Sequence, residues 1–139
     1  MKLAALRLIL TQADLAAMLA RVPMPLSING LTVAIEPDAV VIRGTYQMLV
    51  PVGFESRWIP SAANGKAHAQ LSDFRAMGLP ASILRGKVLG EIRGAVSGPV
   101  SVVGDSVAVD LAAILGRYLP LEVYLRSIVI QSGELVLEA

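Results

Sequence analysis

Residues 31–48 read LTVAIEPDAVVIRGTYQM, and this stretch decides the fold. Apolar and polar side chains alternate on both sides of Glu36-Pro37-Asp38, which is typical of half-buried β-strands. Proline presets its own φ and aspartate can bond its own backbone, so the tripeptide favours a turn. The stretch therefore predicts a β-hairpin with Val40, Ile42, Tyr46 and Met48 on one face of its second strand.

The same pattern continues toward the C-terminus. After Pro51, Phe54 and Trp58 share one face of a further strand, and Asn64-Gly65 is a strong hairpin signal. Strands over 100–103 and 107–109 flank the turn Gly104-Asp105, and Ser132-Gly133 separates the last two strands. A succession of hairpins predicts an antiparallel sheet that is curved and strongly twisted.

Three segments have helical periodicity instead. Thr11 can cap a helix whose Leu15, Met18, Leu19 and Val22 form one apolar stripe, and Asp110 can cap a short helix over 111–118. The longest helix is expected over 81–96. We expect a single α+β domain over residues 1–139, in which the antiparallel sheet wraps around central helix 81–96 and two shorter helices accompany it.

Glycines recur along the predicted helix 81–96. Gly86, Gly90 and Gly94 follow one another at a spacing of four residues. Each glycine in a helix interior costs about 0.5–1 kcal/mol relative to alanine. The repeat therefore predicts that this face approaches another backbone closely.

Composition excludes several classes of protein. The chain has 139 residues, no cysteine, 17% charged residues and a net charge of +1, while 55% are hydrophobic. These values exclude a disulfide framework, thiolate metal sites, disorder and a strongly basic nucleic-acid binder. The longest charge-free stretch, 22–35, is interrupted by prolines, so neither a transmembrane helix nor a signal peptide is predicted. We expect a cytoplasmic protein that contacts membranes at most peripherally.

Candidate chemistry is sparse. His68 is the sole histidine, and although Ser56, Ser61 and Ser72 are near it in sequence, no Gly-x-Ser-x-Gly motif is present. Asp105, Asp110 and Glu122 could form a carboxylate cluster, but turns and helix caps explain the aspartates more simply. Arg85, Lys87 and Arg93 could meet a phosphate headgroup, although solvated helix charges are the simpler interpretation. We expect no enzyme activity, no metal and no cofactor.

Three segments resemble a known family. Residues 31–44 (LTVAIEPDAVVIRG) resemble the first hairpin of the LmeA-like phospholipid-binding domains, and 104–111 (GDSVAVDL) with 119–137 (LPLEVYLRSIVIQSGELVL) resemble their closing segment. These domains belong with the tubular lipid-binding (TULIP) superfamily. The resemblance implies a curved sheet around a long helix, an apolar tunnel, and binding of lipid without catalysis.

The leading hypothesis is therefore a non-catalytic lipid-binding or carrier domain whose partner is a lipid or acyl chain. Its apolar groove is expected between the sheet and helix 81–96. The alternative is a structural or assembly protein that uses its apolar surface to form a homodimer, and an esterase that uses His68 is far less favoured. The predicted lipid-binding residues are Leu84, Val88, Ile92, Val96, Met48, Phe54 and Trp58.

Overall fold

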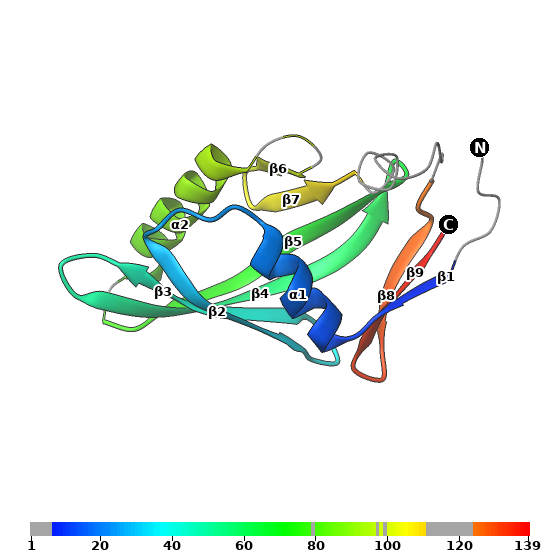
Figure 1. Cartoon of the computed structure of the whole chain (residues 1–139), viewed down its shortest axis with the longest axis horizontal. Helices are drawn as coiled ribbons and strands as arrows, with labels where there is room; N and C mark the ends of the chain where they lie inside the picture. The colour runs from blue at the N-terminus through cyan, green and yellow to red at the C-terminus, as the bar shows by residue number, and fades with distance from the viewer. Residues whose placement is uncertain (1–6, 79, 97, 99, 111–123) are drawn as a thin grey trace.

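A computed structural model describes residues 7–78, 80–96, 98, 100–110 and 124–139. Figure 1 shows how the helices and strands of this part of the chain are arranged. In chain order the elements are β1 (Arg7–Leu10), α1 (Gln12–Arg21), β2 (Ile28–Ile35), β3 (Val40–Gln47), β4 (Pro51–Ala63), β5 (Lys66–Ala76), α2 (Ala81–Ala95), β6 (Val100–Val103), β7 (Ser106–Val109), β8 (Ser127–Gln131) and β9 (Glu134–Glu138).

The strands form two antiparallel sheets. The larger sheet has six strands in the order β2-β3-β4-β5-β7-β6, and the smaller has three in the order β1-β9-β8. All of these neighbours pair antiparallel. The predictions of an α+β fold and an antiparallel sheet are confirmed, whereas the separate sheet that joins the first and last described strands was not expected.

Backbone geometry confirms the hairpin turns that were predicted from sequence. Asn64 and Gly65 have φ of 53° and 75°, and Ser132 and Gly133 have φ of 52° and 76°. Two successive residues with positive φ form the turn type that matches the twist of paired strands. The β4–β5 turn also joins the two sheets, because Leu125 N–H donates to Gly65 O at 2.9 Å.

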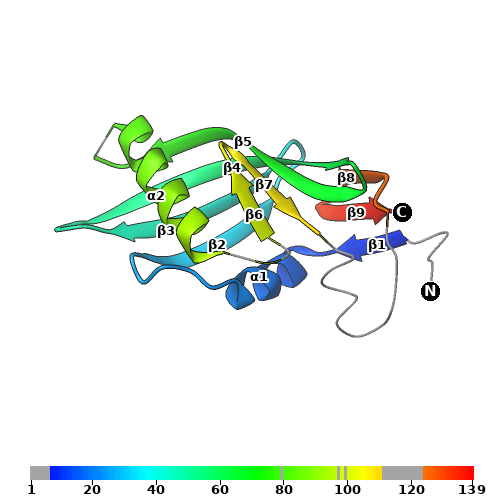
Figure 2. The ribbon, with the colours of Figure 1, turned by 90° about the horizontal axis from the view of Figure 1, so that it is seen from above.

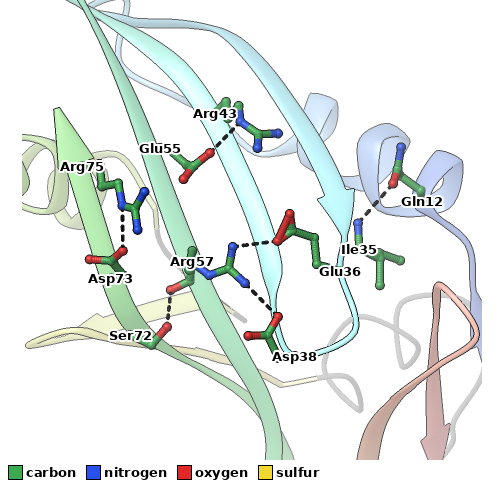
Figure 3. Close-up of polar contacts among 10 residues, drawn as sticks. All are labelled: Gln12, Ile35, Glu36, Asp38, Arg43, Glu55, Arg57, Ser72, Asp73 and Arg75. Atoms are coloured by element: carbon green, nitrogen blue, oxygen red, sulfur yellow. Dashed lines mark hydrogen bonds and ion pairs between the residues drawn. The ribbon is translucent and has the colours of Figure 1, made fainter. Parts of the chain in front are cut away.

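Strand register separates an apolar inner face from a polar outer face in the larger sheet. Ile42 lies opposite Ser56, and Val40 lies opposite Trp58, so these side chains share the inner face. On the outer face Arg57 binds Glu36 at 2.6 Å and Asp38 at 2.7 Å (Figure 3). Further outer-face ion pairs join Arg43 to Glu55 and Arg75 to Asp73 (Figure 3). Paired charges therefore occupy much of this outer face.

Helix α1 is capped by Thr11 as predicted, and the structure shows that Thr11 and Asp14 form a capping box there. Thr11 Oγ1 accepts from Asp14 N–H at 3.2 Å, and Asp14 Oδ2 accepts from Thr11 N–H at 2.9 Å. These two bonds satisfy backbone donors that the first turn of a helix leaves free. Gln12 Oε1 also accepts from Ile35 N–H at 3.1 Å, which attaches the start of α1 to the end of β2.

Helix α2 lies against the inner face near one end of the larger sheet (Figure 2). Leu84 and Val88 are buried in a cluster with Ile28, Tyr46 and Phe54. The prediction of a helix over 81–96 is confirmed to within one residue. The short helix expected over 111–118 lies outside the described residues.

The close approach predicted for the α2 glycines is wrong. A Cβ atom built on Gly86, Gly90 or Gly94 would meet no described atom within 4 Å outside the helix's own nearby backbone, and all three residues are exposed. Helix α2 packs through Leu84, Val88 and Leu89 instead. The spacing correctly placed the three glycines on one face of the helix, but it could not show whether that face is buried or exposed to solvent.

We expect Gly90→Ala to stabilise the fold by about 0.5–1 kcal/mol, because alanine reduces the backbone freedom of the unfolded chain without meeting a neighbour. Urea unfolding of the variant and the wild-type protein measures this difference. A loss of stability would show that the glycine face is covered.

Candidate functional site

An apolar cavity of about 330 Å³ lies between the inner face of the larger sheet and the elements that cover it. Its size is near the lower end of the roughly 300–1,000 Å³ usual for ligand pockets. The larger sheet contributes Ile28, Leu31, Val40, Ile42, Phe54, Ser56, Trp58, Pro60, Ala67, His68, Ala69, Leu71, Phe74, Val100, Val102, Val107 and Val109. The helices and adjoining residues contribute Leu15, Met18, Leu19, Val22, Met24, Val88, Leu89, Ile92 and Val96. The smaller sheet contributes Leu10, Ile128, Leu135 and Leu137.

The cavity offers a ligand little polar chemistry. Apart from Ser56 and His68, every described lining residue is apolar. Ser56 Oγ donates to Ile42 O at 2.9 Å and accepts from Trp58 Nε1 at 2.9 Å, so both side chains are already hydrogen-bonded. Among the described residues, no buried side-chain nitrogen or oxygen lacks a partner. The site can thus surround hydrocarbon, but it has no spare buried group for a polar headgroup.

A second cavity of about 280 Å³ lies between α1 and β2. It shares Leu19, Val22, Met24, Ile28 and Leu31 with the first cavity. The two spaces are therefore neighbours that meet under the end of α1, where the β2–β3 register shifts between Asn29 and Thr32.

The structure brings most of the predicted lipid-binding residues together. Phe54 and Trp58 line the cavity from β4, while Val88, Ile92 and Val96 line it from α2 and its C-terminal cap. Leu84 has no exposed surface and packs between α2 and the sheet instead of lining the cavity. Met48 lies in the β3–β4 turn with 41% of its surface exposed.

Sequence reasoning missed two walls of the cavity. Leu10, Leu135 and Leu137 come from β1 and β9, which pair across almost the whole length of the described chain. Val102 and Val107 face each other across β6 and β7 and close another side. Alternation identifies these residues as inward-facing, but which elements they oppose depends on long-range pairing.

His68 does not join a catalytic arrangement in the described residues. It lies between inward-facing Ala67 and Ala69 on β5, and strand alternation therefore directs its side chain toward the outer face. Its Nε2 atom contacts Ala63 O at 3.2 Å, and Ser72 Oγ donates to Arg57 O at 3.2 Å. The described part of the chain also holds no group of three histidine or carboxylate side chains placed to bind a metal.

The three α2 cations that were considered as possible phosphate contacts do not line the cavity. Arg85 forms an ion pair with Asp105 in the β6–β7 turn, while Lys87 and Arg93 are exposed on α2. Asp105 thus pairs with a cation instead of joining a carboxylate cluster, and Glu122 lies outside the described residues.

Glu91 on α2 is hydrogen-bonded to the larger sheet and to the residue that precedes it. It accepts hydrogen bonds from Ser27 Oγ and, at 2.7 Å, from Tyr46 Oη. The Ser27 and Tyr46 hydrogen bonds lower the pKa of Glu91 from its ordinary value of 4.5, because they favour the charged carboxylate. The hydrogen bond to Glu91 raises the pKa of Tyr46, because it favours the protonated hydroxyl.

We expect Glu91→Gln to reduce the acid sensitivity of the fold. A carboxylate with a lowered folded-state pKa contributes stability that is present above about pH 4.5 and is lost as pH falls through the folded pKa. The stability gap between wild-type and variant proteins should therefore shrink as the pH is lowered from about 7 to about 3. Urea unfolding across this range measures the gap, and a gap that is constant with pH would contradict the prediction. Asp14, whose pKa its hydrogen bonds with Thr11 lower, is present in both proteins and cancels in this difference.

Comparison with known proteins gives no relative. No family model, no curated protein and no solved structure matches the chain. In the described residues, none of the helices has the length and apolar character needed to cross a membrane.

Proposed function

We propose that this protein binds lipid hydrocarbon without catalysing a reaction. The observation that carries the proposal is the cavity of about 330 Å³, which both sheets and both helices line with apolar side chains. Burial of hydrocarbon in such a site contributes about 0.8 kcal/mol for each methylene group. The satisfied hydrogen bonds of Ser56 and Trp58 support an apolar ligand over a polar one.

The ligand class we favour is a single acyl chain, as in a fatty acid or one chain of a phospholipid. The cavity volume is small for a ligand pocket, and the described lining residues offer no charged group. A headgroup would therefore remain outside the cavity. The adjoining space between α1 and β2 is the route by which we propose the chain is admitted, because its lining is continuous with that of the cavity.

The resemblance to TULIP domains belongs to the same proposal. An antiparallel sheet with α2 on its inner face is consistent with that architecture. We propose two further features for this protein by the same resemblance, namely a sheet that wraps fully around α2 and a tunnel through the molecule.

The sole tryptophan provides a direct test. Trp58 lines the cavity, and a bromine atom quenches tryptophan fluorescence only when the two are close. Dibrominated stearic acid should quench Trp58, and unbrominated stearic acid should compete with it. Absence of quenching at saturating ligand would overturn the proposal, and a protein mass that rises with concentration would then favour the homodimer.

Val107→Phe should block this uptake. Val107 faces the cavity from β7, so the larger side chain takes space that ligand methylenes would fill. We expect binding to weaken about tenfold or more, as measured by Trp58 quenching. Val103→Phe is the matched control, because Val103 is on the same hairpin with 75% of its surface exposed. Equal affinities of the two variants would contradict the assignment of the cavity as the binding site.

A further inference from the structure

Five large apolar side chains are exposed at one end of the larger sheet. Exposed fractions are 106% for Leu49, 97% for Leu26, 80% for Met77, 70% for Val50 and 41% for Met48. Figure 1 places the β3–β4 turn and the end of β5 at this end, and Gln47 N–H donates to Ser27 O at 2.7 Å beside Leu26. We call these five residues the apolar tip. A concentration of exposed apolar surface usually marks an interaction site.

The apolar tip also lacks charge. It is built from three sequence segments, 22–35, 44–54 and 76–84, and none of them contains a charged residue. Leu26 precedes β2, Met48, Leu49 and Val50 form the β3–β4 turn, and Met77 follows β5. The topology therefore brings residues from three uncharged stretches, far apart in sequence, to the same end of the molecule.

Most of the charged residues that border the second and third segments form ion pairs with nearby carboxylates or guanidinium groups. Arg43 binds Glu55 at 2.8 Å, and together they bracket the β3–β4 turn. Arg75 and Arg85 bracket the third segment and pair with Asp73 and Asp105. Each pair is electrically neutral, so these residues would contribute little electrostatic attraction to an acidic or a basic partner.

We propose that the apolar tip inserts into the interfacial region of a phospholipid bilayer. Four of its five side chains protrude, as exposed fractions of 70–106% show, and a deformable lipid surface can surround such a tip on all sides. Few unpaired backbone groups would enter, because strand pairing continues to Gln47 and Pro51. Met77 N–H is likewise satisfied by Gly53 O at 3.0 Å. Paired backbone groups lower the cost of contact with hydrocarbon.

Insertion at the tip does not require the cavity to hold a ligand. Trp58 and Val107 belong to the cavity lining, whereas the tip residues do not. Val107→Phe should therefore leave membrane binding unchanged while it reduces fatty-acid uptake. Failure of one proposal can thus be distinguished from failure of the other.

Flotation with vesicles of pure phosphatidylcholine tests the insertion. Wild-type protein should float with these vesicles, and the double variant Leu26→Ser/Leu49→Ser should partition about tenfold or more weakly. The matched control is Val103→Ser/Val129→Ser, which replaces two exposed apolar residues away from the tip and should float like the wild type. Thermal melting checks that all three proteins fold, as expected for substitutions of exposed side chains.

Several outcomes would overturn the proposal. Wild-type protein that does not float, or a tip variant that floats equally well, would exclude insertion by these residues. Flotation that high salt abolishes would indicate binding through charge instead. A vesicle-independent dimer that the tip substitutions dissociate, seen by light scattering, would assign the tip to a second copy of the chain.

Discussion

Replacing Leu84 with alanine should lower the free energy of unfolding by about 2–5 kcal/mol. Leu84 has no exposed surface and lies where α2 meets the larger sheet. Phe54 and Tyr46 surround it in the same buried cluster. Removal of its isopropyl group leaves a void that the paired strands beneath cannot close, so the cost includes both lost burial and an unfilled space.

Urea unfolding measures this loss, and Ile83→Ala is its matched control. Ile83 is the preceding residue on α2 and has 53% of its surface exposed. Its replacement should change stability by less than about 1 kcal/mol. Similar losses for the two variants would contradict the assignment of Leu84 to the buried side of α2.

Gly44→Val should destabilise the fold by about 1–3 kcal/mol, because the inner face has no room for a side chain there. A Cβ atom on Gly44 would lie 2.6 Å from Leu31 Cδ2 and 2.9 Å from Phe54 Cζ. Phe54 is itself buried and stacks on Phe74, with 5.5 Å between their ring centroids. A shift of Phe54 would therefore disturb a second aromatic side chain and the cavity next to it.

Gly53→Val is the control for this prediction. Gly53 is on the adjacent strand with its Cβ direction toward the outer face, and a Cβ atom there would meet only Met77 Sδ at 3.6 Å. Valine suits a half-buried strand position with open space beside it, so thermal melting should show little change or a small gain in stability. If Gly44→Val melts no earlier than Gly53→Val, the close contacts of Gly44 are not limiting.

Local features of the fold were predictable from sequence. Asn64-Gly65 and Ser132-Gly133 favour positive φ, which is a property of the residues themselves. Thr11 and Asp14 form a capping box because their side chains are three residues apart. Each of these signals depends on neighbours in sequence, and each is confirmed.

Long-range pairing was not predictable in the same way. Nothing local to Arg7–Leu10 indicates that β1 pairs with β9 in a second sheet. The face formed by Gly86, Gly90 and Gly94 illustrates the same limit, since periodicity groups residues on a face without showing what lies opposite. The inward direction of Phe54, Trp58 and the apolar stripe of α2 was predictable, because alternation sets the face of a strand and the 3.6-residue period sets the face of a helix. Met48 was not placed correctly, because β3 ends at Gln47 and alternation has no meaning in the turn beyond it.

The pairing of β1 with β9 has a consequence for how the molecule is made. β1 leaves the ribosome before every other described element, and β9 leaves it after them all. Until β9 is complete, Leu10 has no partner strand and the wall formed by Leu135 and Leu137 does not exist. Contacts between such distant segments form slowly, and apolar surface left uncovered meanwhile is prone to aggregate. The apolar surface that becomes the interior is therefore most open to association with other chains before synthesis reaches β9.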